Sequence, residues 1–389
     1  MQRKVFYAAL AGEIVLKSDR VRRRFEKRLL SNLLSAFKKY GVQCTSPKIE
    51  WARVIAACKE DRDYTMAISA ATHTFGIHGA TTAYEITYEN LSDLALRVRD
   101  IAADWVKGKK FAVRARRSGV EGFTSLDVAR EVGAALYNYS AGVDLDNPEV
   151  EVFVEVRGRK AYVHRGFVKG PGGLPIGVEG RAIALFSGGL DSPVAAWMAA
   201  KRGIEVDLLH FILASTASVS DALRVGSRLA KDWLHGYSPK LYVVDFRLVT
   251  EAIRSSVRRD YAQVVLRLAM FDASQLFAEK LGYHAIYTGE SVGQVSSQTL
   301  RNIYAIAKAL PLYMPLLRPL AGLDKEEIMD IGRRIGIYEE AAKTKEYCRL
   351  GEGPVTTAAD PVILHNEYNK IRDIVAKTVE DYTEYNLLD

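Results

Sequence analysis

Hydrophobic and polar positions in the second half of the chain predict strands and helices in regular alternation. Short apolar runs over 181–186, 204–211, 240–246 and 284–288 are bounded by polar turns, as is typical of buried parallel strands. Helical patterns fill the intervals between these runs. This alternation predicts a doubly wound α/β sheet, in which ligands bind at the carboxyl ends of the strands.

The first half of the chain has the pattern of two small α+β units. Strand-like segments at 4–10 and 49–57 flank a basic helical stretch over 20–30. The densest run of proline and glycine begins at Gly170 and is typical of a linker. We therefore expect an N-terminal domain, a second domain, a linker and a larger C-terminal domain, over 1–75, 76–169, 170–180 and 181–389.

Charge is distributed unevenly between the two halves. Residues 1–180 carry 29 Lys/Arg and 21 Asp/Glu, a net charge of +8, whereas residues 181–389 carry 25 and 26, a net charge of −1. The basic half is expected to contact a polyanion, although a solvated helix face and a charge-protected edge strand are the alternatives. Candidate RNA contacts are Arg22, Arg23, Lys110, Arg114, Arg116 and Arg117.

The turn over 187–192, Ser-Gly-Gly-Leu-Asp-Ser, follows an apolar strand and opens a helix. Gly188 and Gly189 leave backbone N–H groups unobstructed, while Ser187 and Ser192 add hydroxyl donors where the helix dipole favours an anion. The turn therefore predicts a pyrophosphate site. It lacks the lysine loop of ordinary kinases and GTPases and the GxGxxG fingerprint of nicotinamide enzymes, and a glycine-rich capping turn is the alternative.

Three further positions carry candidate chemistry. A carboxylate at Asp191 is unfavourable beside phosphates unless it binds Mg²⁺ or activates a nucleophile, and helix capping is the alternative. His210 ends a strand, where nucleotide packing is favoured over general base catalysis. Cys348 follows Lys343 and Lys345, whose charges favour a thiolate.

The remaining cysteines and the apolar runs set further expectations. Three cysteines are too few and too scattered to predict a disulfide scaffold or a metal site. Cys44 and Cys58 lie in apolar, strand-like settings and are expected to be core thiols. No apolar run approaches the ~20 residues that span a bilayer. The N-terminus leads into a strand rather than a signal peptide, and we expect a cytoplasmic protein.

Several motifs resemble known families. The order Ser-Gly-Gly-x-Asp-Ser resembles the PP-loop of ATP pyrophosphatases, which adenylate a substrate and release pyrophosphate. The run FAVRARRSG…TSLDVAREVG resembles the THUMP domain, an RNA-binding module. With GESVGQVSSQT, LRPLAGLDKEEI and KTKEYC in order, the chain to about residue 360 resembles the tRNA sulfurtransferase family, the 4-thiouridine synthetases called ThiI.

The resemblance implies ferredoxin-like, THUMP and PP-loop domains in that order. It implies adenylation of a uridine O4 in tRNA by ATP with Mg²⁺, followed by attack of a sulfur species and loss of AMP. The resemblance also implies catalytic roles for Asp191, Lys325 and Cys348. Without it, Lys325 would be an exposed lysine in the first turn of a helix, where its charge is slightly unfavourable. The resemblance implies that ATP is contacted by residues from several parts of the PP-loop domain. These are the loop residues Ser187, Gly188, Gly189 and Ser192, and also Leu185, Phe186, His210, Phe211, Arg267, Gly289 and Gln298.

Some features depart from the resembled family. We expect no rhodanese-like domain, no Cys-x-x-Cys precedes Leu266, and Arg349 stands where the family has glycine. The sulfur donor is therefore open between a persulfide carrier, such as a cysteine desulfurase, and free sulfide. What regenerates Cys348 is open between Cys44, Cys58, a thiol of a partner and free sulfide.

The family commonly dimerises, so a homodimer is expected, while a role in thiamine synthesis is secondary. Two other readings remain open at this point. One is another PP-loop tRNA-modifying enzyme or ligase with an inert Cys348, and the other is a non-catalytic RNA-binding protein.

Overall fold

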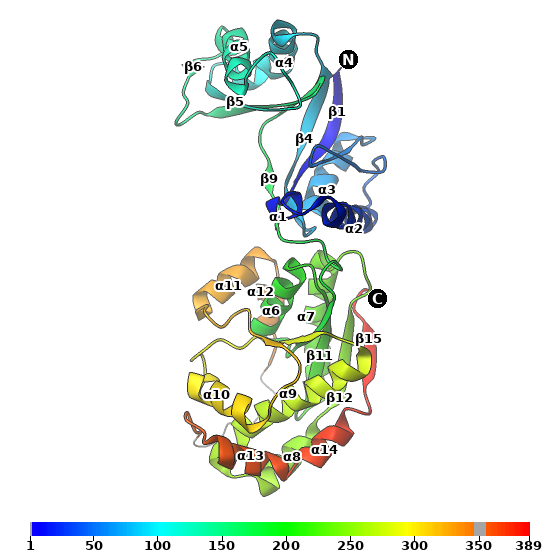
Figure 1. Cartoon of the computed structure of the whole chain (residues 1–389), viewed down its shortest axis with the longest axis vertical. Helices are drawn as coiled ribbons and strands as arrows, with labels where there is room; N and C mark the ends of the chain where they lie inside the picture. Colours follow the sequence, from blue (N-terminus) through cyan, green and yellow to red (C-terminus); the bar gives the residue numbers. More distant parts are fainter. Residues whose placement is uncertain (1, 346–354) are drawn as a thin grey trace. The chain divides into compact units, whose positions relative to one another are not determined.

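The computed structural model describes residues 2–345 and 355–389. The chain forms two compact units, unit 1 over Met1–Leu174 and unit 2 over Pro175–Asp389 (Figure 1). Cys348 lies outside the described residues.

Unit 1 contains a nine-stranded sheet in the order β2-β3-β1-β4-β8-β7-β5-β6, with β9 beside β4. Its strands are β1 (Gln2–Leu10), β2 (Lys48–Glu50), β3 (Arg53–Ala56), β4 (Ile77–Thr87), β5 (Lys110–Ser118), β6 (Gly142–Val143), β7 (Val150–Arg157), β8 (Lys160–His164) and β9 (Val168–Lys169). Its helices are α1 (Gly12–Val15), α2 (Asp19–Lys39), α3 (Asp61–Thr72), α4 (Leu91–Val106) and α5 (Ser125–Tyr137).

Strand β4 belongs to both halves of this sheet. It pairs antiparallel with β1 from Ile77 to Ile86, and its last residues, Tyr84 to Thr87, also pair with β8. A strand bonded on both edges cannot be separated from either neighbour without breaking backbone hydrogen bonds. The segments over 1–75 and 76–169 therefore share one sheet.

The cysteines of unit 1 correct the expectation of core thiols. Cys44 and Cys58 are half-buried and form a disulfide, with their Cα atoms 3.9 Å apart. Thr45 N donates to Ala57 O at 2.7 Å and Lys59 N donates to the Gln43 carbonyl at 3.0 Å, so the cysteines face each other between these hydrogen bonds. Such opposed positions bring Cα atoms closest in an antiparallel pair, which suits a disulfide.

Unit 2 contains a six-stranded sheet in the order β14-β13-β10-β11-β12-β15. Its strands are β10 (Arg181–Leu185), β11 (Glu205–Ile212), β12 (Lys240–Asp245), β13 (Ala285–Tyr287), β14 (Leu316–Leu317) and β15 (Thr383–Asn386). All neighbours are parallel except β12 and β15, which are antiparallel. The four predicted strands thus form the centre of the sheet, and the predicted doubly wound α/β fold is confirmed.

Helices cover both faces of the unit 2 sheet. One group consists of α6 (Asp191–Lys201), α7 (Ala217–Trp233), α11 (Lys325–Arg334) and α12 (Tyr338–Ala341), which pack on one another (Figure 1). The other consists of α8 (Arg247–Ser256), α9 (Ala262–Leu281), α10 (Leu300–Ala309), α13 (Pro361–Asn369) and α14 (Arg372–Thr378). Successive side chains of β10 point to opposite faces of the sheet. Ile183 and Leu185 point to the face covered by α9, where they join the large apolar core.

Candidate active site in unit 2

The loop over 187–192, called the phosphate loop below, connects β10 to α6. Gly188 has a φ of +82°, and a Cβ there would lie 3.2 Å from the backbone N of Ala222 in α7. Only glycine combines this left-handed conformation with so close an approach. Ser187 N donates to Ser192 Oγ at 3.2 Å and Gly189 N donates to Ser187 Oγ at 3.3 Å, so the two hydroxyls order the loop from inside.

The end of β13 meets the first turn of α6 at Gly289. A Cβ on Gly289 would lie 2.8 Å from the carbonyl carbon of Asp191 and 3.0 Å from the backbone N of Ser192. Glycine is therefore required where the carboxyl end of β13 approaches the phosphate loop. This contact aligns the carboxyl ends of β10 and β13 around one space.

That space is a cavity of about 510 Å³ at the carboxyl ends of β10, β11 and β13. It is lined by every predicted ATP contact except Gly188, and also by Asp191. Apolar side chains from α9 line it as well, and further lining comes from two residues near the end of the described segment, Thr344 and Lys345. The volume is that of a typical small-molecule site.

His210 is held by hydrogen bonds at both ring nitrogens. Its Nδ1 lies 2.8 Å from the Phe186 carbonyl oxygen, which only accepts, so Nδ1 carries the proton. Its Nε2 lies 2.9 Å from Ser218 Oγ. Burial lowers the pKa of His210, and a neutral ring bonded at both nitrogens is suited to shaping the cavity rather than to accepting a proton from a substrate.

Arg267 reaches the cavity as part of a buried charge cluster. Its Nη1 donates to Glu290 Oε1 at 2.6 Å and its Nε donates to Ser297 Oγ at 2.8 Å. The second oxygen of Glu290 accepts from Arg318 Nε at 2.7 Å. Glu290 is 2% exposed, so its charge is compensated by two guanidinium groups that fix its position.

Asp191 and Lys325 form an ion pair at the edge of this site. Lys325 Nζ donates to Asp191 Oδ1 at 2.7 Å, and Gln294 Nε2 donates to Asp191 Oδ2 at 2.9 Å. Lys325 is the first residue of α11, whose N-cap, Asp324, makes a capping box with Glu327. The capping box starts the helix where Lys325 reaches the phosphate loop.

The sequence matches known families and proteins over nearly the whole chain. Residues 177–372 match the thiamine biosynthesis protein (ThiI) family, residues 88–164 the THUMP domain and residues 10–81 the ThiI ferredoxin-like domain. The tRNA sulfurtransferase of Desulfurococcus amylolyticus is 42% identical over 352 residues, which cover 90% of this chain and 72% of that protein. The probable tRNA sulfurtransferase of Aeropyrum pernix is 41% identical over 364 residues, covering 93% and 91%.

The chain belongs to the tRNA sulfurtransferase family. A solved structure supports the same fold: the crystal structure of a 4-thiouridine synthetase–RNA complex with bound ATP aligns with a TM-score of 0.80 and 27% identity. The alignment covers 98% of this sulfurtransferase and 99% of the synthetase chain. The predicted order of ferredoxin-like, THUMP and PP-loop domains is confirmed by these matches.

Most predicted RNA contacts of the sulfurtransferase lie on β5, and several already have partners. Val113 and Ala115 pack against the core, as period-two alternation predicts. Arg114, between them, is half-buried and its Nε donates to Glu151 at 2.7 Å, whereas Arg116, which follows Ala115, is exposed. Of the other candidates, Arg117 donates to the Val120 carbonyl, Lys110 lies 4.0 Å from Asp144, Arg22 pairs with Glu26 at 2.7 Å and Arg23 is exposed on α2.

Sequence reasoning missed several residues of the sulfurtransferase site. Glu290 was recognisable as a carboxylate directly after an apolar strand, within the motif GESVGQ. Arg318, Thr344 and Lys345 lie in the motifs LRPLAGLDKEEI and KTKEYC, but nothing local indicated that Arg318 pairs with Glu290 or that Thr344 and Lys345 line the cavity.

In the described residues, no helix is long and apolar enough to cross a membrane, and no group of three or more His, Cys, Asp and Glu is placed to hold a metal.

Proposed function

We propose that this sulfurtransferase uses ATP to convert a tRNA uridine to 4-thiouridine, releasing AMP and pyrophosphate. The observation that carries the proposal is the phosphate loop opening into a cavity whose edge holds the Asp191–Lys325 pair. A cavity that combines a donor-rich loop with an apolar wall suits a nucleotide. The ATP bound in the structurally similar 4-thiouridine synthetase supports this choice.

The nucleotide would bind with its phosphates at the phosphate loop. Ser187, Gly189 and Ser192 line the cavity at the start of α6, where the helix dipole favours negative charge, and a bound phosphate would replace the bonds that their amides and hydroxyls make within the loop. Apolar lining by Phe211, Leu266 and Phe271 suits the adenine face. Phosphate binding and base binding thus use different parts of one cavity.

Adenylation would begin with attack of the uridine O4 on the α-phosphorus of ATP. The O4–P bond forms, the bond from the α-phosphorus to the bridging oxygen breaks, and pyrophosphate leaves as uridine N3 loses its proton. Negative charge grows on the departing pyrophosphate, so fixed cationic donors lower the barrier. Lys325 is a compact ammonium held at the phosphate loop and is suited to this role.

The residues present fit a Mg²⁺ ion. Of the two carboxylates that line the cavity in the described part of the chain, Glu290 is held between two guanidinium groups, whereas Asp191 faces an ammonium and an amide. Mg²⁺ in such sites takes one or two protein carboxylates together with substrate phosphates. Asp191 would hold the ion, which when bound neutralises phosphate charge.

Sulfur transfer would follow at C4 of the adenylated uridine. A sulfur nucleophile forms a C4–S bond, and the C4–O bond to AMP breaks. With sulfide the product is thiouridine directly, whereas a Cys348 persulfide leaves a C4–S–S–Cys link that a second thiol must reduce. Cys44 and Cys58 are paired with each other in unit 1, so in this state neither supplies that thiol.

Unit 1 would bind the tRNA, with Arg23 and Arg116 as its exposed basic candidates. Phosphate contacts by such arginines supply affinity without sequence information. We propose domain limits at 1–75, 76–169 and 181–389 with a linker over 170–180. We also propose that the protein is a homodimer in the cytoplasm. Its sulfur donor would be a persulfide carrier or free sulfide.

The test is incubation of the purified chain with unmodified tRNA transcript, Mg-ATP and sulfide, followed by mass spectrometry of nucleosides. Formation of 4-thiouridine by the wild type supports the proposal, and AMP should appear in equal amount. Cys348→Ala separates a cysteine relay, which it abolishes, from direct sulfide attack, which it leaves intact. ATP cleavage without thiouridine, or RNA binding without ATP cleavage, would instead favour another PP-loop enzyme or a binding protein.

A further inference from the structure

The charged side chains that line the cavity differ in whether they are already paired. Glu290 is compensated by Arg267 and by Arg318, and Asp191 is compensated by Lys325. The remaining lining charge is Lys345, which is exposed and has no carboxylate within ion-pair distance among residues 2–345 and 355–389. Within residues 2–345 and 355–389, the cavity therefore presents one ammonium without a compensating anion.

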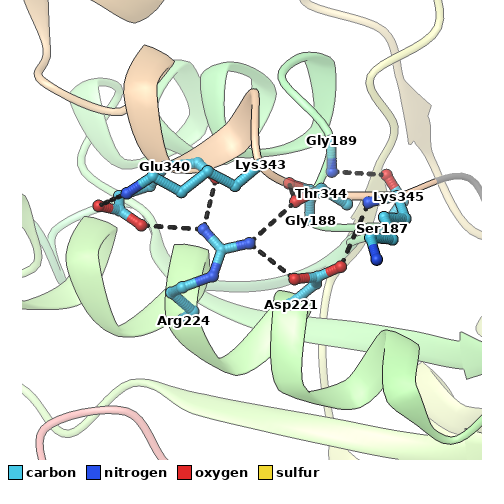
Figure 2. Close-up of polar contacts among 9 residues, drawn as sticks. All are labelled: Ser187, Gly188, Gly189, Asp221, Arg224, Glu340, Lys343, Thr344 and Lys345. Carbon is cyan, nitrogen blue, oxygen red and sulfur yellow. Dashed lines mark hydrogen bonds and ion pairs between the residues drawn. The ribbon is translucent and has the colours of Figure 1, made fainter.

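The backbone that carries Lys345 is fixed to α7. Lys345 N donates to Asp221 Oδ2 at 3.3 Å, and the other oxygen of Asp221 accepts from Arg224 Nη2 at 2.7 Å. Arg224 Nη1 donates to Glu340 Oε2 at 2.9 Å and also to the Glu340 backbone carbonyl. Figure 2 shows Arg224 between Asp221 on one side and Glu340 on the other.

A threonine hydroxyl joins this network to the phosphate loop. Arg224 Nη2 donates to Thr344 Oγ1 at 3.5 Å, and Thr344 Oγ1 donates to the Gly188 carbonyl at 2.8 Å (Figure 2). Since a hydroxyl has one proton, the guanidinium occupies its acceptor side and directs that proton to Gly188. The segment over 340–345 is thus tied to both α7 and the phosphate loop.

We propose that Lys345 is a second cationic ligand for the phosphates of the bound nucleotide. Its place is set by Asp221, Arg224 and Thr344, with Arg224 as a positioning residue that does not itself touch the phosphates. The proposal rests on the proposed function, since it requires ATP in the cavity. The chemistry fits, because an uncompensated ammonium beside a donor-rich loop gains most when a polyanion enters.

The experiment measures the affinity of the wild type and of Lys345→Met for Mg-ATP and for adenosine, which has no phosphates, by calorimetry. We expect Lys345→Met to weaken Mg-ATP binding about tenfold, the loss of one charge-assisted hydrogen bond, and to leave adenosine binding within about twofold. Lys345→Arg should retain most of the affinity. The matched control is Lys308→Met, the same charge change on the exposed surface of α10.

The outcomes separate this proposal from the proposed function. If the wild type binds Mg-ATP and Lys345→Met binds it equally well, or loses adenosine to the same extent, Lys345 is not a phosphate ligand while ATP use stands. If the wild type binds no Mg-ATP, the proposed function and this proposal both fail. A thermal melt of each variant identifies any loss that is due to unfolding.

The positioning role of Arg224 is tested by a double-mutant cycle. Arg224→Gln should weaken Mg-ATP binding in the wild-type background but have little further effect when Lys345 is already methionine. A purely structural role of Arg224 would weaken binding equally in both backgrounds and would also reduce adenosine affinity. Additive losses would therefore overturn the positioning role and leave the Lys345 assignment to the first experiment.

Discussion

Lys325 Nζ lies 2.7 Å from Asp191 Oδ1, although 134 residues separate the two side chains along the chain. Asp191 is the first residue of α6 and Lys325 is the first residue of α11, so the pair joins the starts of two helices that pack together. Under the proposed function, the ammonium at the phosphate loop would exchange this carboxylate for a phosphate oxygen of the nucleotide.

Asp191→Asn and Lys325→Met should each lower the rate of 4-thiouridine formation about 10²- to 10³-fold, since fixed charges of this kind act on the developing charge of the transition state. Mass spectrometry under saturating Mg-ATP and tRNA measures the rate. Glu326→Gln, the neighbouring position on α11, is the control and should keep the wild-type rate. Near wild-type activity in both variants would contradict a catalytic role for the pair.

Gly289→Ala should abolish Mg-ATP binding or weaken it at least about tenfold. The added Cβ would lie 2.8 Å from the Asp191 carbonyl carbon, so the end of β13 or the phosphate loop must move. Calorimetry with Mg-ATP measures the effect. Gly322→Ala is the matched change, because its Cβ would have no heavy atom within 4 Å, and it should bind normally.

The central strands and the phosphate loop were predictable because their signals are local. An apolar run, a glycine turn and a helix follow one another within residues 181–201, and parallel strands bring their carboxyl ends to one edge. The contacts between Thr344 and Gly188, 156 residues apart, and between Arg318 and Glu290 depend on how later segments pack, which no local pattern encodes. The sequence therefore indicated the loop that opens into the cavity but not the distant residues that hold this loop in place.

The disulfide escaped prediction for a related reason. Cys44 and Cys58 lie in a single isolated bridge outside the named strands. Alternation of apolar residues fixes register only where a strand is long enough to have a buried face. A single opposed pair has no such pattern, so the apolar surroundings of the cysteines suggested core thiols instead.

Arg116→Ala should weaken tRNA binding several-fold and reduce the slope of log affinity against log salt by about 1, if Arg116 contacts a phosphate. Binding of labelled tRNA across a series of salt concentrations measures both quantities. Arg62→Ala on α3, whose side chain is 72% exposed beside Glu60, removes the same charge from unit 1 and should leave the slope unchanged. Equal effects of the two substitutions would indicate a general charge effect rather than a contact.

Glu155 should make the stability of unit 1 sensitive to acid. Burial alone raises the pKa of Glu155, but the charges and hydrogen bonds of its partners, including Arg53 and Arg157, outweigh burial and hold it well below the usual range. A depressed pKa in the folded state stabilises unit 1 fully above the ordinary glutamate value of 4.5, and this contribution is lost as pH falls below it.

Glu155→Gln should therefore lower the free energy of unfolding at pH 7 by about 3–5 kcal/mol, because two arginines lose their partner in a buried setting. It should also flatten the fall in stability below pH 4.5. Urea unfolding at several pH values measures both effects. Glu151→Gln, which breaks a half-exposed pair with Arg114, is the control and should cost less than about 1 kcal/mol.

Replacing both Cys44 and Cys58 by serine should lower the free energy of unfolding of unit 1 by about 3 kcal/mol, the value for a closed loop of this size. The two cysteines are 14 residues apart. Urea unfolding with and without dithiothreitol measures the effect, and the reductant should destabilise the wild type but not the double variant. A wild type that is insensitive to dithiothreitol would show that the bond contributes nothing.

The Cys44–Cys58 bond is only half-buried, so small thiols in solution reach its surroundings. Sulfide and persulfides, the two classes of donor considered for the reaction, exchange readily with disulfides. A medium rich in the sulfur that feeds the reaction is thus also one that opens this bond. A concentration of sulfide or persulfide high enough to feed the reaction is therefore expected also to reduce the disulfide that stabilises unit 1.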